Sequence, residues 1–240
     1  MTDSIREQIL TNFEIRLAAI TKANQYNTDM GKTVLRSHLP PIDGSLCPAI
    51  GFHLDDEENL EMYHRDERKE LPIRVQGVDK FKTHTAAEKA ELLYADICEC
   101  VLSDEWSLGF DSGGGNEISP GDTLTGETSA ATALVISVSL DSGVWADGDA
   151  AGTFTLRRMV GTFQNNEELT ANVDSGAATV DGVQSGTGAL SLTTGGLCEG
   201  ITFSTGNIQT PDADGTVVGV QIVFRVRYRS IAGNPYSQTI

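Results

Sequence analysis

The sequence predicts an α+β fold, in which two helices cover a mixed or antiparallel sheet and a small all-β domain is inserted into the chain. Three observations support this class. The segments 2–23 and 85–102 carry apolar residues at helical spacing. Residues 217–228 alternate between apolar and polar side chains over the length of a long strand. Residues 111–194 are rich in Gly, Ser, Thr and Asp and contain short alternating runs.

Each predicted helix begins with a capping box, in which a Ser or Thr and a Glu three residues later exchange hydrogen bonds. Ser4 and Glu7 open the first helix, and Thr85 and Glu88 open the second. Each helix then shows one apolar stripe, which we expect to face the sheet. The stripe residues are Ile5, Ile9, Phe13, Leu17 and Ile20 in the first helix and Ala90, Leu93, Ile97 and Val101 in the second.

Three short strands are predicted between the helices, at 32–37, 47–54 and 71–78. They are rich in apolar and β-branched residues, and Pro72 suits the start of the third strand better than its middle. The acidic residues 55–58 after the second strand predict a loop, and a mixed-charge stretch follows as far as Glu70.

The block 111–194 predicts a small sandwich or barrel. Short strands separated by turn residues are typical of all-β domains, and about 80 residues suffice for one. The runs are 133–138, 152–156, 168–173 and 177–180, with turn signals such as Asp147-Gly148 and Asp181-Gly182.

A short strand is predicted at 201–203. The long strand at 217–228 determines the predicted domain organisation. Its apolar face cannot be buried by the strand alone, so we expect it to join the sheet of the N-terminal segment. This assigns residues 1–110 and 195–240 to one discontinuous α+β domain, and residues 111–194 to an inserted all-β domain. The apolar face comprises Val218, Val220, Ile222, Phe224, Val226 and Tyr228, and the other face is mainly basic.

Composition excludes some function classes. The 240 residues carry a formal charge of −17, which argues against general affinity for nucleic acid, although the charge is equally consistent with a role in solubility alone. No run of about 18 apolar residues predicts a membrane span, and the N-terminus does not have the pattern of a signal peptide. Four irregularly spaced cysteines favour a reducing compartment over a disulfide framework.

No pattern for catalysis or cofactor binding emerges from the sequence. Cys98 and Cys100 are two residues apart on a predicted helix and so point to different sides. The glycines 113–115 are not followed by the Lys-Ser/Thr pair of a phosphate loop. We therefore expect no catalytic residue, no cofactor and no metal, and a structural or interaction protein rather than an enzyme. The histidines, which lack the spacing of zinc ligands, are His38, His53, His64 and His84.

Four features, taken in order along the chain, carry a resemblance to a known family. They are the N-terminal helix followed by Tyr26-Asn27-Thr28-Asp29-Met30-Gly31, a strand at 71–77 before a helix that ends at 101–104, the element Leu197-Cys198-Glu199-Gly200-Ile201, and a final strand that runs into Arg229-Ser230 and Asn234-Pro235-Tyr236. In this order and spacing, the chain outside the insertion resembles phage tail terminator (tail-completion) proteins of long-tailed phages. The insertion departs from compact terminators, and its segments 121–126, 152–156 and 163–167 look like a small β-domain that recurs in phage virion proteins.

The resemblance implies a hexameric ring that caps the head-proximal end of the tail tube, stops tube polymerisation and joins the tail to the neck. The implied partners are further copies of the chain, the tail tube protein and the head-side neck or connector protein. Genomic DNA would pass through the ring without specific binding, since an acidic lumen repels phosphates. The implied location is the tail-neck region of the virion, after assembly in the host cytoplasm. The alternatives are another neck or head-completion connector protein, and a carbohydrate- or receptor-binding virion module.

The candidate contact residues for a neighbouring subunit or the tube are basic residues of the final strand and a predicted loop at 77–83. We expect the arginines to pair with acidic groups of an adjacent subunit, so that Arg225→Glu with Arg227→Glu would weaken ring assembly and leave the monomer folded. The alternative is a solvated face with scattered ion pairs, each worth well under about 1 kcal/mol. The candidates are Arg225, Arg227, Arg229, Gly77, Asp79 and Lys80.

Overall fold

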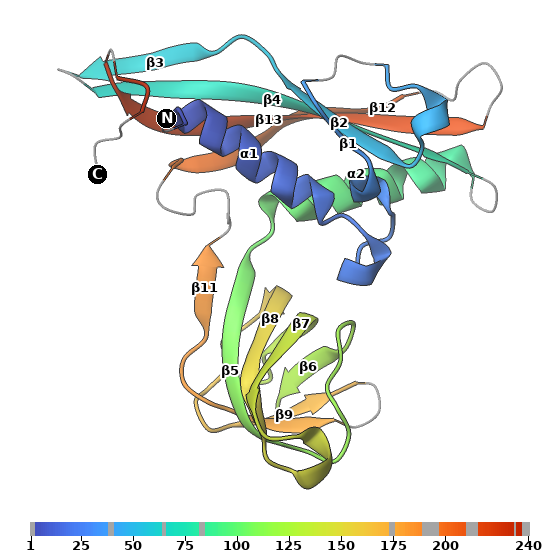
Figure 1. Cartoon of the computed structure of the whole chain (residues 1–240), viewed down its shortest axis with the longest axis vertical. Helices are drawn as coiled ribbons and strands as arrows, with labels where there is room; N and C mark the ends of the chain where they lie inside the picture. Colours follow the sequence, from blue (N-terminus) through green and yellow to red (C-terminus); the bar gives the residue numbers. More distant parts are fainter. Residues whose placement is uncertain are drawn as a thin grey trace. The chain divides into compact units, whose positions relative to one another are not determined.

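The computed structural model describes residues 3–37, 41–63, 66–81, 85–172, 176–188, 197–209, 216–232 and 234–236. The chain divides into two compact units (Figure 1). The first unit combines Met1–Leu102 with Leu190–Ile240, and the second is Ser103–Ala189. Residues 105–110, which the sequence prediction placed in the first domain, belong to a strand of the second unit.

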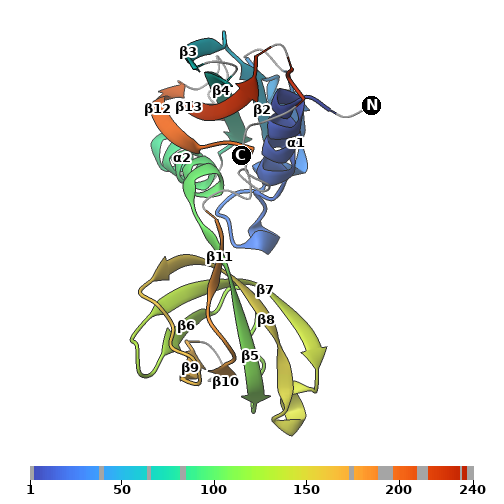
Figure 2. The ribbon, with the colours of Figure 1, turned by 90° about the vertical axis from the view of Figure 1, so that its left-hand side faces the viewer.

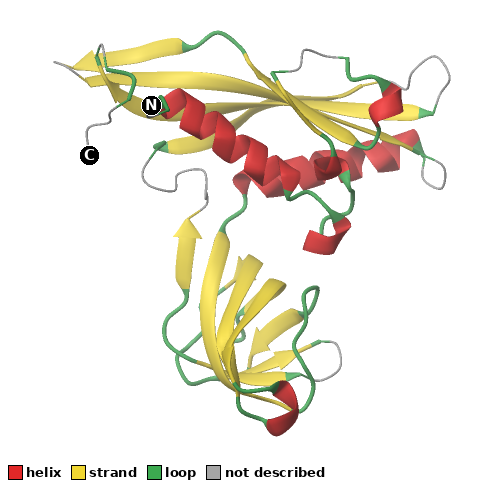
Figure 3. Cartoon of the chain, viewed as in Figure 1, coloured by secondary structure: helices red, strands yellow, loops and turns green. Residues whose placement is uncertain are grey.

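The predicted fold class, an α+β sheet covered by two helices, is wrong. The chain is predominantly β (Figure 3), and of the described residues 49% lie in strands and 21% in helices, the 3₁₀ turns included. The described residues contain 13 strands in two sheets and two α-helices. The excess of strand comes from segments whose charged or small side chains hid the alternation, such as 58–70 and 200–209. None of the helices in the described part of the chain is long and apolar enough to cross a membrane.

Six strands form the sheet of the first unit, in the order β1-β2-β4-β13-β12, with β3 also paired to β4. The pair β1–β2 is parallel and the other pairs are antiparallel. The bounds are β1 Val34–Arg36, β2 Ala49–Leu54, β3 Glu58–Tyr63, β4 Asp66–Lys80, β12 Gly200–Gln209 and β13 Val217–Ile231.

The centre of this sheet is the long pair β4–β13, in which each strand has 15 residues. Their register is continuous from Val217 opposite Lys80 to Ile231 opposite Asp66. The alternation predicted at 217–228 is confirmed, since its apolar residues are buried and its arginines exposed. A strand with one apolar and one charged face has a strongly specified register, because a slip of one residue would bury the charges.

Two helices, α1 (Ile5–Ala18) and α2 (Ala86–Leu102), share one apolar core with the inward face of this sheet. The capping box of α2 is confirmed: the Thr85 N–H donates to the Glu88 carboxylate, and the Glu88 N–H donates to Thr85 Oγ1. At α1, Ser4 Oγ accepts from the Glu7 N–H. Short 3₁₀ turns lie at Lys22–Asn24, Met30–Lys32 and Gly44–Leu46.

A buried carboxylate on α2 holds the segment between α1 and β1. Asp96 is fully buried, and its two oxygens accept four hydrogen bonds. Two come from the backbone N–H groups of Asn27 and Thr28 at 3.0 and 2.8 Å, and two come from their side chains at 2.8 and 2.6 Å. This segment belongs to one of the motifs that carry the family resemblance, and Asp96 fixes it to the core.

The second unit is a closed antiparallel barrel. Its strands follow the order β10-β9-β6-β7-β8-β5-β11, and β10 also pairs with β5, which closes the barrel. Closure leaves fewer free strand edges. The bounds are β5 Glu105–Gly114, β6 Thr123–Gly126, β7 Thr132–Ser142, β8 Ala150–Val160, β9 Glu168–Ala171, β10 Ala177–Val180 and β11 Ser185–Gly188, with a 3₁₀ turn at Trp145–Asp147.

The two ends of the barrel segment lie side by side. In the pair β5–β11, Glu105 is opposite Gly188 (Figure 2). Opposed residues of an antiparallel pair have Cα atoms about 5 Å apart. The segment therefore leaves and rejoins the first unit's chain from neighbouring points, as an inserted domain requires.

Candidate assembly surface

The outward face of the first sheet carries the three predicted arginines. Successive residues of a strand point to opposite faces, so Arg225, Arg227 and Arg229 lie together on the face away from the core. Their side chains are 46%, 45% and 50% exposed.

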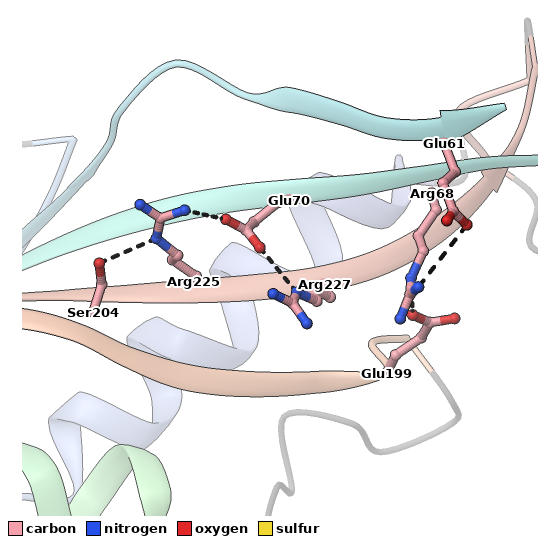
Figure 4. Close-up of polar contacts among 7 residues, drawn as sticks. All are labelled: Glu61, Arg68, Glu70, Glu199, Ser204, Arg225 and Arg227. Atoms are coloured by element: carbon pink, nitrogen blue, oxygen red, sulfur yellow. Dashed lines mark hydrogen bonds and ion pairs between the residues drawn. The ribbon is translucent and has the colours of Figure 1, made fainter.

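A buried glutamate on the neighbouring strand joins two of these arginines (Figure 4). Glu70 of β4 lies directly opposite Arg227 of β13, and its side chain is only 2% exposed. Arg225 Nη1 donates to Glu70 Oε1 at 2.6 Å, and Arg227 Nε donates to Oε2 at 2.9 Å. The hydrogen bond from Arg227, opposed by burial and reinforced by Arg225, lowers the pKa of Glu70 below its usual value.

A second charge cluster lies at the end of the sheet where β12 begins. Glu199 accepts a hydrogen bond from Arg68 Nε at 2.6 Å and another from Arg229 Nε. Arg68 Nη1 also lies 4.0 Å from Glu61 of β3. Burial raises the pKa of Glu199, but the hydrogen bonds from Arg229 and Arg68 outweigh burial and lower it overall.

The two clusters together place four arginines against three glutamates, so the face is far less basic than the arginines alone suggest. Arg225 also donates from Nε to Ser204 Oγ of β12 at 3.1 Å. The arginines expected to pair with a neighbouring subunit thus pair within the chain, where they link β4, β13 and β12. Replacing both Arg225 and Arg227 by Glu would add two carboxylates beside the buried Glu70. We therefore expect the double substitution to destabilise the monomer, in contrast to the expectation from the sequence that the monomer would stay folded.

The predicted contact loop at 77–83 is wrong for its first half, because Gly77, Asp79 and Lys80 belong to β4. A Cβ on Gly77 would lie 2.5 Å from Met30 Sδ, so this glycine allows close packing in the core. Asp79 Oδ2 pairs with Lys89 Nζ of α2 at 2.6 Å, and both side chains are largely buried. Lys80 alone of these three is exposed, at the end of β4 far from the arginines.

The edge strand β12 is much longer than the short strand predicted from the sequence at 201–203. Within the described residues β12 pairs with β13 and with no other strand. Every residue from Thr202 to Ile208 is exposed, and β12 carries no charged side chain. Phe203 and Ile208 expose 42% and 48% of their surface. Small and polar residues such as Gly206 broke the apolar alternation that would have predicted the full strand.

The middle of β12 is hollowed on both faces of the sheet. On the core side, a hollow of about 360 Å³ is bounded by Glu91 and Tyr94 of α2 and by the strand itself at Gly206–Ile208. On the outer face, a second hollow of about 160 Å³ lies between β12 and residues that include Arg74 and Gln221. The middle of β12 is therefore accessible from both faces of the sheet.

The opposite edge of the sheet is acidic where it carries β3. This strand pairs only with β4 among the described residues, and Glu58–Met62 are all exposed. It includes Glu58 and Glu61 and follows the acidic residues 55–57. Leu60 and Met62 expose 40% and 63% of their surface. No strand was predicted here from the sequence, because the charged residues conceal the alternation of the strand.

The described residues include no group of three or more His, Cys, Asp or Glu that could hold a metal ion. His38, His64 and His84 lie outside the described residues, and His53 Nε2 is 3.5 Å from Asp55 Oδ1. The arrangement offers strand edges and a charge network, which bind another polypeptide more readily than a small molecule. No family model matches the chain, and a search of curated proteins finds no match.

Proposed function

We propose that this protein is a tail terminator: a structural virion protein that forms a ring on the head-proximal end of a phage tail tube and joins the tail to the neck. The observation that carries the proposal is the division of the chain. The segments that resemble terminators, although separated by the barrel, belong to one compact unit, and the segment without the resemblance forms the other. A terminator with an inserted domain would divide in this way.

The free edges of the first sheet add physical support for self-association. A long exposed edge strand presents unpaired backbone groups, and monomeric proteins usually protect such edges with charges, prolines or a covering segment. The described residues of β12 contain no charge and no proline. A ring in which each copy contacts two neighbours would cover both edges of every sheet.

In the proposed ring, other copies of the chain lie on either side, the tail tube protein lies on one face and the head-side connector on the other. Genomic DNA passes through without specific binding, which the charge of −17 favours by repelling phosphates. The barrel would then serve as a decoration or neck contact on the outside of the ring.

The alternative of a carbohydrate-binding module finds less support in the barrel. Such modules present exposed aromatic rings, whereas Trp145, Phe154 and Phe163 are all buried. Phe110 lies in one aromatic cluster with Trp145 and Phe154, with ring centroids 5.3 and 4.1 Å away. A neck connector could use the same free edges, so only an assembly experiment separates it from a terminator.

The test is tube assembly with and without this protein. We expect particles assembled in its absence to contain tubes of uncontrolled length that carry no head, and addition of the purified protein to growing tubes to stop elongation at one end. Normal tube length with unattached heads would instead identify a head-side connector. Normal particles would refute both roles.

A further inference from the structure

The first sheet ends in β12 on one side and in β1 and β3 on the other, and β3 and β12 run in opposite directions. From β3 through β4 and β13 to β12, each neighbouring pair is antiparallel, so β3 and β12 are antiparallel to each other. If a second copy continued the sheet beyond β12 in the same orientation, its β3 would lie beside β12 as an antiparallel strand. Antiparallel addition of a strand to a sheet edge is a common mode of recognition.

The outward faces of the two edges have complementary charge. Residues opposite each other in a sheet point to the same face, so Glu58, which lies opposite Glu70, shares the face of Arg227. The register shift between Asn59 and Glu61 places Glu61 opposite Arg68 on that same face. The irregularity in β3 thus brings both exposed glutamates to the arginine side.

The core-side faces also match each other. Phe203 of β12 lies opposite Phe224, whose side chain is buried in the core. Met62 of β3 lies opposite Glu67, which in turn is opposite Ser230 on the same face of β13 as Phe224. Arg225 lies opposite Thr202 of β12, so a pairing that places Glu61 beside Thr202 would bring Met62 within two residues of Phe203 on the core-side face.

We propose that β12 of one copy takes up β3 of the next copy as an additional antiparallel strand, so that the sheets continue from subunit to subunit. This inference rests on the proposed ring and names its contact. The incoming strand would lie about 10 Å from β13, since neighbouring strands are about 5 Å apart. This distance is about one Debye length at 0.1 M salt, so Glu58 and Glu61 would attract Arg225 and Arg227 of the neighbour.

The competing contact is a two-fold symmetric pair, in which β12 of one copy pairs with β12 of a second copy. It accounts for fewer of the features of the two edges. It would bring two arginine-bearing faces together without the additional glutamates Glu58 and Glu61, and it would leave β3 exposed. It would also close as a dimer, whereas the β12–β3 contact joins two different surfaces and continues until a ring closes.

The test begins with the mass of the native chain in solution and then maps the contact with cysteines. Met62→Cys and Phe203→Cys are introduced separately and together, because both side chains are exposed and lie on the core-side face. A short cross-linker with two thiol-reactive ends is added to each variant and to the native chain. The native chain is the control for the partly exposed Cys47 and Cys98.

We expect the double variant to give a ladder of cross-linked products up to the size of the ring. An equal mixture of the two single variants should give cross-linked dimers and nothing larger, and each single variant alone should match the native chain. Cross-linked dimers of Phe203→Cys alone would overturn the proposal in favour of the two-fold contact. A ring-sized native mass without a ladder would overturn the contact and leave the ring, whereas a monomeric native chain without cross-links would overturn both.

A charge test uses matched variants. Glu58→Gln with Glu61→Gln should raise the concentration needed for assembly about five- to tenfold and weaken its dependence on salt. Glu117→Gln with Glu127→Gln makes the same change of net charge on exposed glutamates of the barrel and should leave assembly unchanged. Equal effects of the two pairs would overturn the proposed role of the β3 glutamates.

Discussion

Replacing Glu70 with Gln should destabilise the first unit by about 2 kcal/mol at neutral pH. Each oxygen of this buried carboxylate accepts one hydrogen bond from an arginine, at 2.6 and 2.9 Å. Gln keeps the size of the side chain and one acceptor, but it turns an amide NH₂ toward the other guanidinium, which also can only donate. Loss of a hydrogen bond to a charged group costs about 1.5–3 kcal/mol, and the half-exposed arginines recover part of this from water.

The same substitution should change the pH dependence of stability. The pKa of Glu70 is lowered from 4.5 in the folded protein. A carboxyl of this kind stabilises the fold fully above its unfolded pKa and loses that contribution as the pH falls through its folded pKa. Gln does not titrate. The difference between the native chain and the variant should therefore be full at pH 7 and shrink below about pH 4.5.

Urea unfolding followed by two signals can separate the two units. Both α-helices of the described residues belong to the first unit, so helical circular dichroism reports on it. Both tryptophans of the chain, Trp106 and Trp145, lie in the barrel, so their fluorescence reports on the second unit. We expect Glu70→Gln to shift the dichroism transition and not the fluorescence transition.

The matched control for this experiment is Glu61→Gln on the same face. Its side chain is 71% exposed and lies 4.0 Å from Arg68, so its replacement should change stability by less than about 0.5 kcal/mol. Equal losses for Glu70→Gln and Glu61→Gln, or a loss for Glu70→Gln that does not depend on pH, would refute the reasoning about the buried carboxylate.

Three further predictions concern the two units. Asp96→Asn should cost the first unit about 2–3 kcal/mol in the dichroism transition, because one oxygen that accepts two hydrogen bonds becomes a donor; a loss below about 0.5 kcal/mol would contradict this. Glu167→Gln should destabilise only the barrel, by about 2 kcal/mol in the fluorescence transition, because this carboxylate accepts hydrogen bonds from Ser129 and Gln164; an equal shift in dichroism would count against separate units. Burial raises the pKa of Glu167, but those hydrogen bonds lower it overall, so this loss should also shrink below about pH 4.5. Deleting Ser103–Ala189 and joining the ends with a short glycine linker should leave a cooperative dichroism transition, and its disappearance would show that the first unit depends on the barrel.

The sequence predicts strands well where the two faces differ in polarity. At 217–228 every side chain on the core side is apolar, and the outer side carries Gln221, Arg225 and Arg227, so both the strand and the position of its arginines follow from the alternation. At 58–70 both faces of the sheet carry charged side chains, which pair with each other: Lys69 with Glu67 at 3.0 Å and Arg68 with Glu199 at 2.6 Å. Such charges leave no apolar periodicity, so no strand was predicted at 58–70 and the predicted fold class contained too little strand.

The candidate site was predictable only in part, because its contacts are distant in sequence. The alternation along the final strand places the arginines together on its outer face. Their acidic partner could not be predicted in this way, because Arg225 and Glu70 are 155 residues apart. No local pattern indicates which of the chain's 34 acidic residues would lie opposite. The edge strand β12 was missed for a different reason: an exposed edge has little apolar side chain to bury and so gives a weak signal.

The mass of the purified chain in solution, measured over a range of concentrations, tests the central claim most directly. A ring built from one heterologous contact predicts a single closed species at a fixed multiple of 25.6 kDa, and the resemblance to tail terminators implies a hexamer. A mass of 25.6 kDa at every concentration, or a dimer that does not grow further, would contradict the account.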